Sequence, residues 1–249
     1  MLSITETTLH PSLPCADLMG STDQHQGRNW LVIGGSKGIG RAAVLQLLQE
    51  GNCVHVMSRT KGDTPEGAIH HAHDLNDWSI DFPKIDGELH GLIVAAGSVE
   101  RRALMKDLKP EDFMETYRRS TVNVIRPIQN YLPQMPKGAG VAVLSASQAK
   151  TGYPAFGDFA AAKAGLEAII RTWAREETKS RGITMVCIRP WYVIKDDENP
   201  DAHAKVRERS PLGLLSKESE VAQVMLASMR VPSMSGQDIP VGAGTEVTR

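Results

Sequence analysis

A glycine-rich turn between an apolar run and an amphipathic segment most limits how this chain can fold. The run NWLVIG at 29–34 is short, apolar and closed by glycine, which is typical of a buried parallel strand. Residues 40–51 place Val44, Leu47 and Leu48 at helical spacing. A strand, a tight turn and a helix in this order predict the opening unit of a parallel α/β sheet.

The same alternation continues along the chain. Further strands are expected at 53–58, 68–75, 89–97, 140–147, 182–190 and 237–244. Further helices are expected at 111–135, with a bend at Pro127, and at 157–180 and 216–230. The stretch 76–88 is short and rich in Pro and Asp, so it predicts an abbreviated connection without a crossover helix.

These elements predict a single α/β domain at 28–249. Its core is expected to be a doubly wound parallel sheet of about seven strands with helices on both faces. Residues 1–27 have no apolar period and are expected to form a flexible N-terminal extension.

Composition excludes several classes of function. The 249 residues have a formal net charge of −1 and no run of Lys or Arg, so nucleic acid and anionic membranes lack their electrostatic attraction. No apolar run is long enough to span a bilayer. Cys15, Cys53 and Cys187 have no metal-site or redox spacing, and such a scattered set favours a reducing, cytoplasmic setting. The expected partner is a small-molecule substrate.

The turn has the spacing of a phosphate-binding loop. Gly34, Gly38 and Gly40 follow a G-x-x-x-G-x-G pattern. The first glycine permits the tight turn, the second lets the backbone approach a pyrophosphate, and the third allows the helix to pack closely on the strand. Free N–H groups at the start of the helix then face the anionic oxygens. This context favours dinucleotide binding over a glycine-rich turn that binds nothing.

Residues 28–249 resemble the short-chain dehydrogenase/reductase family at several points in order. GGSKGIG resembles the cofactor loop, HDL at 73–75 the adenine clamp, and VAAG at 94–97 the Asn-Asn-Ala-Gly segment with both Asn lost. GQDIPVGAG at 236–244 resembles the closing strand. The resemblance implies a single-domain Rossmann fold, a nicotinamide cofactor, and a homotetramer or homodimer in which the helix at 157–180 forms a dimer face.

The residues after the second expected strand favour NADP(H) over NAD. An NAD form of the family carries an acid there, whereas Ser58 and Arg59 suit a 2′-phosphate and Lys37 adds a cation. The alternative is that both cations are ordinary solvated charges. The residues expected to hold NADP(H) are Gly34, Ser36, Lys37, Gly38, Ile39, Gly40, Ser58, Arg59, Asp74, Leu75, Ala96, Gly97, Lys163, Pro190 and Val193.

The resemblance also implies a catalytic group of Asn, Ser, Tyr and Lys, of which only the lysine is retained. Lys163 is in place, but Phe159 stands at the position of the proton-donating Tyr and Ala146 at that of the Ser. Ser120 falls at the Asn position, and Asn123 lies three residues later.

Neighbouring side chains are candidates for the missing functions. Tyr153 could donate a proton or pack against substrate, and Asp158 could donate a proton or, as we favour, stabilise the start of its helix. The candidate catalytic residues are Lys163, Tyr153, Ser120 and Asp158. The candidate pocket residues are Ala146, Ser147, Tyr153, Phe159, Trp191 and Tyr192, whose four rings are expected to form one aromatic wall.

Two further stretches bear on the site. His70, His71 and His73 match no metal-site spacing, and no metal is expected. The charged stretch 195–212 lies where relatives carry a mobile substrate lid, and His203 within it is a candidate substrate contact.

Loss of the built-in acid limits the substrate. An alkoxide product needs a proton donor, but an iminium gives a neutral amine and a conjugated enone gives an enolate that solvent can protonate. We therefore expect an atypical NADP(H)-dependent reductase of an iminium, imine or conjugated carbonyl compound, in specialised biosynthesis. The alternatives are a non-redox cyclase, isomerase or dehydratase on the same scaffold, and a nucleotide-binding pseudoenzyme.

Overall fold

A computed structural model describes residues 27–97 and 102–246 of the chain. Its long sheet contains β1 (Asn29–Ile33), β2 (Cys53–Ser58), β3 (Ile69–Ala72), β4 (Gly91–Val94), β5 (Gly140–Leu144), β6 (Thr184–Pro190) and β9 (Asp238–Val241). Among the described residues these seven strands run parallel in the order β3-β2-β1-β4-β5-β6-β9. The expected doubly wound parallel sheet is therefore confirmed. The expected N-terminal extension lies outside the described residues except for Gly27.

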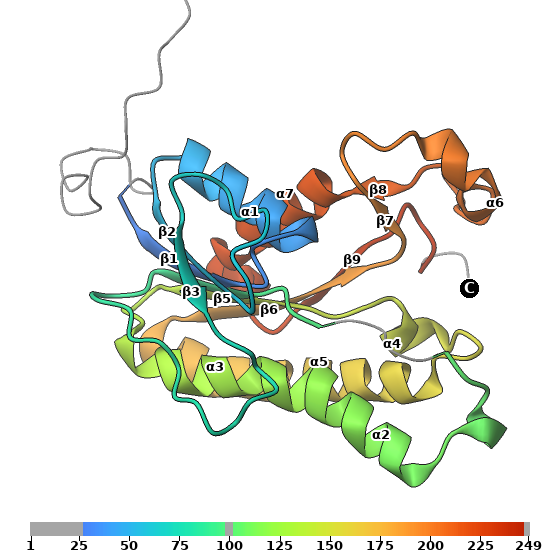
Figure 1. Ribbon diagram of the computed structural model, residues 1–249, viewed down its shortest axis with the longest axis horizontal. Helices are drawn as coiled ribbons and strands as arrows, with labels where there is room; N and C mark the ends of the chain where they lie inside the picture. Colours follow the sequence, from blue (N-terminus) through green and yellow to red (C-terminus); the bar gives the residue numbers. More distant parts are fainter. Residues whose placement is uncertain (1–26, 98–101, 247–249) are drawn as a thin grey trace, which may run out of the picture.

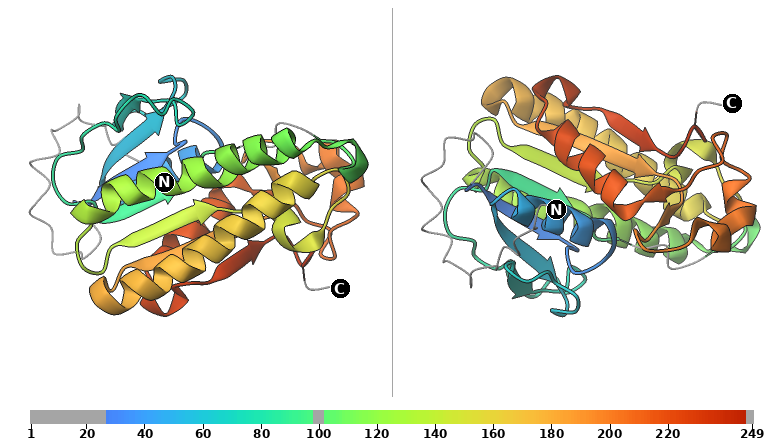
Figure 2. Two further views of the ribbon diagram at one scale, coloured as in Figure 1. Left: turned by 90° about the horizontal axis from the view of Figure 1, so that it is seen from below. Right: turned by 90° about the horizontal axis from the view of Figure 1, so that it is seen from above.

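Helices cover both faces of the sheet (Figure 1), and the two views of Figure 2 show these faces in turn. One face carries α1 (Gly38–Gln49) and α7 (Glu218–Met229), and the other carries α2 (Pro110–Tyr117), α3 (Asn123–Tyr131) and α5 (Gly157–Arg181). Along β1, Trp30 and Val32 join the core under α1 and α7, while Leu31 and Ile33 join the core under α3 and α5. Burial on both faces explains why this strand is apolar throughout.

The remaining elements are short. They are η2 (Met105–Asp107), η4 (Leu132–Gln134), α4 (Gln148–Thr151), β7 (Val193–Ile194), η5 (Pro200–His203), α6 (Ala204–Arg207), β8 (Ser216–Lys217) and η6 (Pro232–Met234). Residues 76–88, all of them described, contain no helix, so the expected abbreviated connection is confirmed.

The helix expected at 111–135 is divided at a place that the sequence did not indicate. The division is a π-helical turn, η3 (Arg118–Val122), in which the N–H of Asn123 donates to the carbonyl of Arg118. Pro127 lies inside α3 instead. The π turn buries Thr121, whose hydroxyl donates to the carbonyl of Ala162 on α5 at 2.7 Å. This contact with a distant helix is not visible in local spacing.

Two expectations about the environment can be compared with the structure. No helix within the described ranges is long and apolar enough to cross a membrane. Cys187 is a free, buried thiol, but Cys53 is disulfide-bonded. The bond at Cys53 was not expected from the spacing of the cysteines.

The histidines of the β2–β3 edge pack against each other. Nδ1 of His55 lies 2.9 Å from Nε2 of His71, and their rings are stacked with centroids 5.1 Å apart. Burial, reinforced by His71, lowers the pKa of His55 from 6.5 to about 4, and burial also lowers the pKa of His71. Among the described residues, no group of three or more His, Cys, Asp or Glu could hold a metal ion.

We expect these histidines to destabilise the fold in mild acid. The folded state keeps His55 neutral down to about pH 4, while the unfolded chain binds its proton near 6.5, so the free energy of unfolding should fall as pH drops through this window. Urea unfolding at neutral and mildly acidic pH measures the loss, and His55→Gln should reduce it. An identical pH dependence in the wild type and the variant would contradict the assignment.

Candidate active site

The glycine loop lies between β1 and α1, where the chain leaves the carboxyl edge of the sheet. Gly34 has a φ of +83°, in the left-handed region that glycine adopts most readily. A Cβ on Gly40 would lie 2.3 Å from the carbonyl oxygen of Gly34, so α1 can begin this close to β1 only with glycine there. The first turn of α1 contains no acidic side chain, which leaves its N–H groups suited to an anion.

This loop sits where the strand order reverses. The sheet continues from β1 to β2 on one side and to β4 on the other, which creates the crevice where open α/β sheets bind their ligands. Ala96 and Gly97 follow β4 at the same edge. A Cβ on Gly97 would lie 3.6 Å from Nζ of Lys163, so the lysine borders this crevice.

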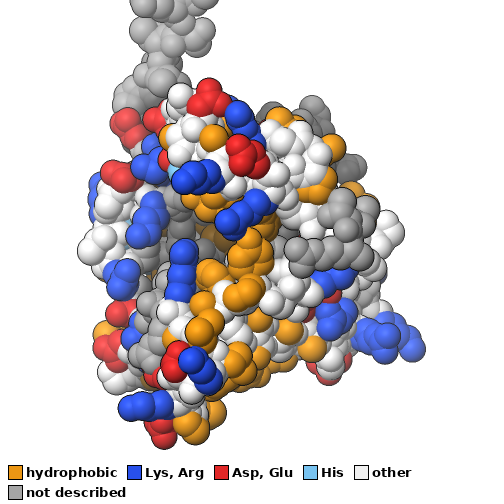
Figure 3. Space-filling model, turned by 90° about the vertical axis from the view of Figure 1, so that its right-hand side faces the viewer, with side chains coloured by type: hydrophobic (Ala, Val, Ile, Leu, Met, Phe, Trp, Pro, Cys, Tyr) orange, Lys and Arg blue, Asp and Glu red, His pale blue; other side chains and the backbone are white. Residues whose placement is uncertain are grey.

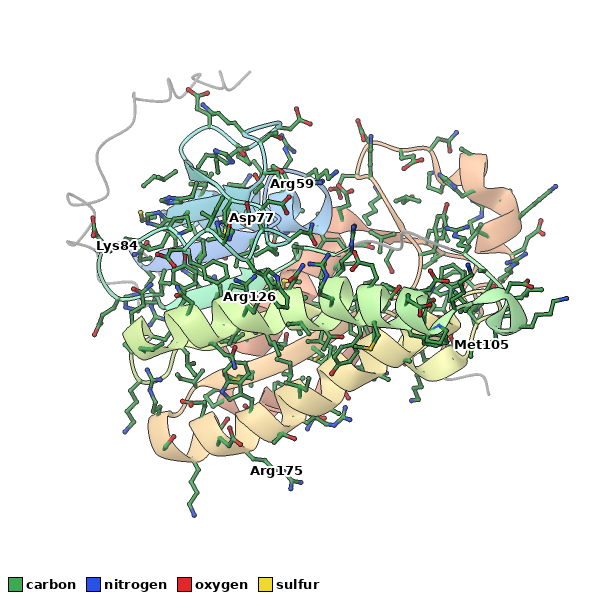
Figure 4. All side chains as sticks on the ribbon, turned by 60° about the horizontal axis from the view of Figure 1, so that its bottom comes forward. Arg59, Asp77, Lys84, Met105, Arg126 and Arg175 are labelled. Atoms are coloured by element: carbon green, nitrogen blue, oxygen red, sulfur yellow. The ribbon has the colours of Figure 1, made fainter. Side chains whose placement is uncertain are left out.

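Two cationic side chains lie at this edge of the sheet, Lys37 within the glycine loop and Arg59 directly after β2. The side chains of Arg59, labelled in Figure 4, and of Lys37 are both exposed, and neither side chain forms a hydrogen bond or ion pair with another described residue. Ser58 is already engaged, because its hydroxyl donates to the carbonyl of Thr60 at 2.7 Å and lies 3.0 Å from Nε2 of His70. Both charged groups are therefore open to solvent, whereas the Ser58 hydroxyl is not free.

Asn123 supports the expected adenine-clamp loop. Its Nδ2 donates to Oδ1 of Asn76, and its Oδ1 accepts from Nε1 of Trp78, both at 2.9 Å. Asn76 in turn donates through its backbone N–H and its Nδ2 to Oδ1 of Asp74, at 3.0 and 3.1 Å. Asn123 is thus occupied with this loop, three residues beyond the position where the family's catalytic Asn is expected.

Arg126 on α3 holds the same loop, and the sequence did not identify it (Figure 4). Its Nη1 donates to the carbonyl of Leu75 at 3.3 Å, and its guanidinium lies 4.8 Å from the ring of Trp78 and 5.4 Å from that of Phe82. Arg126 and Leu75 are 51 positions apart, so no local pattern relates them.

Hydrocarbon side chains occupy both positions where the resemblance implies a hydroxyl. Phe159 is 7% exposed and Ala146 is 8% exposed. Lys163, one turn further along α5, is 3% exposed, and its Nζ donates to the carbonyl of Leu144 at 2.7 Å. Burial lowers the pKa of Lys163 to about 8, although a buried thiol and Glu167 act in the opposite direction. The amine therefore stays charged at neutral pH but holds its proton less firmly than an exposed lysine.

The other catalytic candidates differ in how far their polar atoms are engaged. The hydroxyl of Tyr153 accepts from Nη1 of Arg209 at 3.0 Å. Oδ2 of Asp158 accepts from the hydroxyl of Thr116 on α2 at 2.6 Å, and Asp158 makes no cap bond although it lies in the first turn of α5. The hydroxyl of Ser120 is buried and has no hydrogen-bond partner among the described residues.

The aromatic side chains expected to line the pocket make their ring contacts in separate pairs within the described residues. Tyr153 packs edge-on against Phe156 and Trp191 packs beside Tyr192, each pair with ring centroids 6.3 Å apart. Within the described part of the chain, no ring contact joins these pairs to each other or to Phe159. Ser147, also in the expected pocket, is buried and donates its backbone N–H to Pro190.

The expected lid is an excursion between β7 and β8, which pair in parallel and close its base. Nδ1 of its His203 lies 3.2 Å from the hydroxyl of Tyr192, and Nε2 lies 2.6 Å from Oε1 of Glu198. His203 is therefore engaged within the lid region. Figure 3 shows the end of the molecule that carries the lid: hydrophobic side chains run along the middle of this face, with Lys and Arg on either side.

An open parallel sheet with helices on both faces and a glycine-rich turn at the reversal of its strand order defines an α/β protein of the Rossmann class. A family model described as enoyl-(acyl carrier protein) reductase matches residues 34–246. The chain belongs to the short-chain dehydrogenase/reductase family, a family of oxidoreductases.

Individual relatives agree with this assignment. The 3-oxoacyl-[acyl-carrier-protein] reductase FabG of Staphylococcus epidermidis is 28% identical over 238 residues, covering 86% of this chain and 97% of that protein. The NADPH-dependent aldehyde reductase-like protein, chloroplastic, of Arabidopsis thaliana is 25% identical, covering 88% and 94%. A short-chain dehydrogenase from Burkholderia cenocepacia in complex with NADP shares the fold, with a TM-score of 0.76 at 22% identity, covering 90% of this chain and 100% of that one.

We expect Gly40→Ala to be more damaging than Gly38→Ala. The first places a Cβ 2.3 Å from a backbone oxygen, which should destabilise the fold by about 3 kcal/mol. The second meets only a carboxylate oxygen of Glu218 at 3.8 Å, which leaves about 1 kcal/mol for its left-handed backbone. Chemical unfolding of both variants measures the difference, and equal losses would contradict the close approach of α1 to β1.

Proposed function

We propose that this protein is an NADP(H)-dependent reductase that adds hydride to a small molecule already activated for reduction: an iminium, an imine or a conjugated carbonyl compound. One observation carries the proposal. The glycine loop keeps the geometry of a dinucleotide site, while Phe159 and Ala146 put buried hydrocarbon at both positions where the family's hydroxyls act.

The residues around the loop fit a phosphorylated dinucleotide. Gly34 and Gly40 let the backbone turn and approach closely, and the start of α1 offers N–H groups to a pyrophosphate. Arg59 and Lys37 would bind the 2′-phosphate, and Asp74 the adenine. The reduced nicotinamide would supply the hydride. The NADP complex of the Burkholderia cenocepacia relative and the name of the Arabidopsis thaliana relative support NADP(H).

The side chains expected near the nicotinamide favour a substrate whose reduction needs no proton donor from the protein. Lys163 would bind the ribose hydroxyls through its buried amine, and Ser120 would hold a water with its free hydroxyl. Phe159 excludes water but has no proton to give. Reduction of a plain ketone without a general acid loses roughly 10²–10⁴-fold in rate. Hydride addition to an iminium needs no proton, and the enolate from a conjugated carbonyl can take its proton from water.

The names of the relatives divide between these chemistries. The matching family description names an enoyl reductase, which adds hydride to a conjugated carbonyl, whereas FabG is named for reduction of a 3-oxoacyl group. The missing hydroxyls favour the first chemistry. Leu104 and Met105 near the start of α5, and Leu212 and Leu214 in the lid, are 49–66% exposed and support an apolar substrate.

We further propose a cytoplasmic role in specialised biosynthesis and assembly as a homotetramer or homodimer through α5. The outer face of α5 borders an open groove of about 940 Å³ against η6 and the start of β9. Arg175 on this face points away from the body of the molecule (Figure 4). Trp173 is half-buried and packs partly against the protein's own core, so it would contribute only its exposed edge to a partner.

We expect Arg59→Ala to weaken NADPH binding by about tenfold or more, because a charge-assisted bond to the 2′-phosphate is lost. NADH lacks this phosphate, so its affinity should not change. Lys61→Ala, which removes another exposed cation two residues away, is the matched control. Fluorescence titration with both nucleotides measures the affinities, and an equal loss for NADPH and NADH would contradict the assignment of Arg59.

We expect the wild type to oxidise NADPH with cyclic iminium compounds or enones and to turn over plain ketones slowly. Phe159→Tyr combined with Ala146→Ser should raise ketone reduction by about 10²-fold, because it restores the acid beside Lys163. Loss of NADPH absorbance measures both. Rapid ketone reduction by the wild type would contradict the proposal. Tight NADPH binding without any turnover would indicate a pseudoenzyme, and substrate conversion without NADPH loss would indicate a non-redox enzyme.

A further inference from the structure

The segment 242–246, at the C-terminal end of the described chain, has a strained backbone beside the expected substrate pocket. Ala243 has a φ of +49°, in the left-handed region that residues other than glycine rarely adopt. The segment adjoins Trp191, because a Cβ on Gly242 would lie 2.8 Å from Cβ of Trp191, and the Trp191 N–H donates to Val241 at 3.1 Å. Strain of this kind persists only where surrounding contacts hold the backbone.

A buried ion pair supplies such a contact. The side chain of Glu246 is 4% exposed, and its Oε2 accepts from Nη1 of Arg189 at 2.7 Å. Arg189 lies on β6 and also donates to both carboxylate oxygens of Glu167 on α5, at 2.9 and 3.0 Å. The second carboxylate oxygen of Glu246 is buried and has no partner among the described residues. Arg189 is therefore the group that holds this carboxylate.

The lid rests on the same segment. Ser210, which is buried, donates its hydroxyl to the carbonyl of Ala243 at 3.2 Å. A Cβ on Gly244 would lie 3.4 Å from Cβ of Pro211, so the next lid residue is in contact as well. A continuous series of contacts thus runs from Arg189 through Glu246 and the strained segment to the lid.

We propose that Glu246 is a positioning residue that seats the lid, residues 195–215, through its ion pair with Arg189. The pair holds segment 242–246 in its strained conformation, and this segment forms the support for Ser210 and Pro211. It also keeps Trp191 in place at the substrate end of the site. This role concerns the closure of the site and does not depend on which reaction the site performs.

Other carboxylates surround Arg189, so substitution of Glu246 should affect the lid without unfolding the domain. If Glu246 is removed, Glu167 still makes two bonds to Arg189, and Oδ2 of Asp238 lies 3.6 Å from its Nη2. The guanidinium therefore keeps its neutralising partners. Substitution of Arg189 or Glu167 would instead leave an uncompensated buried charge and destabilise the whole domain.

Limited proteolysis with trypsin tests the proposal, because the lid contains Lys205, Arg207 and Arg209. Glu246→Ala should raise the initial cleavage rate at these sites by about tenfold, as expected when a charge-assisted hydrogen bond no longer opposes local opening. Glu246→Gln retains an oxygen that can accept from Arg189 and should give a smaller increase. Mass spectrometry assigns each cut, and cleavage after the exposed Lys137, before β5, should stay unchanged.

Glu50→Ala is the control, since it breaks a different Glu–Arg pair, with Arg230, which is less buried and lies away from the lid. It should leave lid cleavage at the wild-type rate, and Glu246→Ala should bind NADPH within about twofold of wild type. Wild-type cleavage of the lid in Glu246→Ala, or an equal increase in both variants, would overturn the proposal. A wild type that binds no NADPH would refute the proposed function, while the proteolysis comparison would still decide the role of Glu246.

Discussion

Seven parallel strands end at one edge of the sheet, and the site depends on this constraint. Parallel pairing brings the carboxyl ends of strands that are far apart in the sequence to the same side of the molecule. The segments that leave this edge therefore converge whatever their own length. They carry the glycine loop, Arg59, Asp74, Gly97, Ala146 and Trp191.

Helix α5 carries three charged side chains that contact neighbouring strands. Lys163, Glu167 and Arg171 are spaced four residues apart and so share one face of the helix. Lys163 binds a carbonyl at the end of β5, Glu167 binds Arg189 on β6, and Arg171 pairs with Asp238 on β9. Lys163 and Glu167 are buried, and a buried charge is costly unless it is paired, so their contacts constrain the helix against β5 and β6 and limit the positions open to the lysine.

Periodicity predicted the elements better than it predicted their contacts. The two-sided burial of β1 makes it apolar throughout, so it was readily recognised, and β2 was placed at its observed bounds. The π turn before α3 was missed, because it accompanies burial of Thr121 against α5 rather than any local signal. Arg126 was missed for the same reason, since its partner Leu75 lies 51 positions away.

The sequence by itself determined the fold class, the glycine loop and the absence of a hydroxyl at Phe159 and Ala146. These follow from residue type and short-range spacing, which are properties of the covalent chain. Only the tertiary structure decided that Asn123 supports the loop after β3, that the rings separate into pairs, and that Glu246 meets Arg189. Such contacts join segments many residues apart, and they exist only once the sheet has brought those segments together.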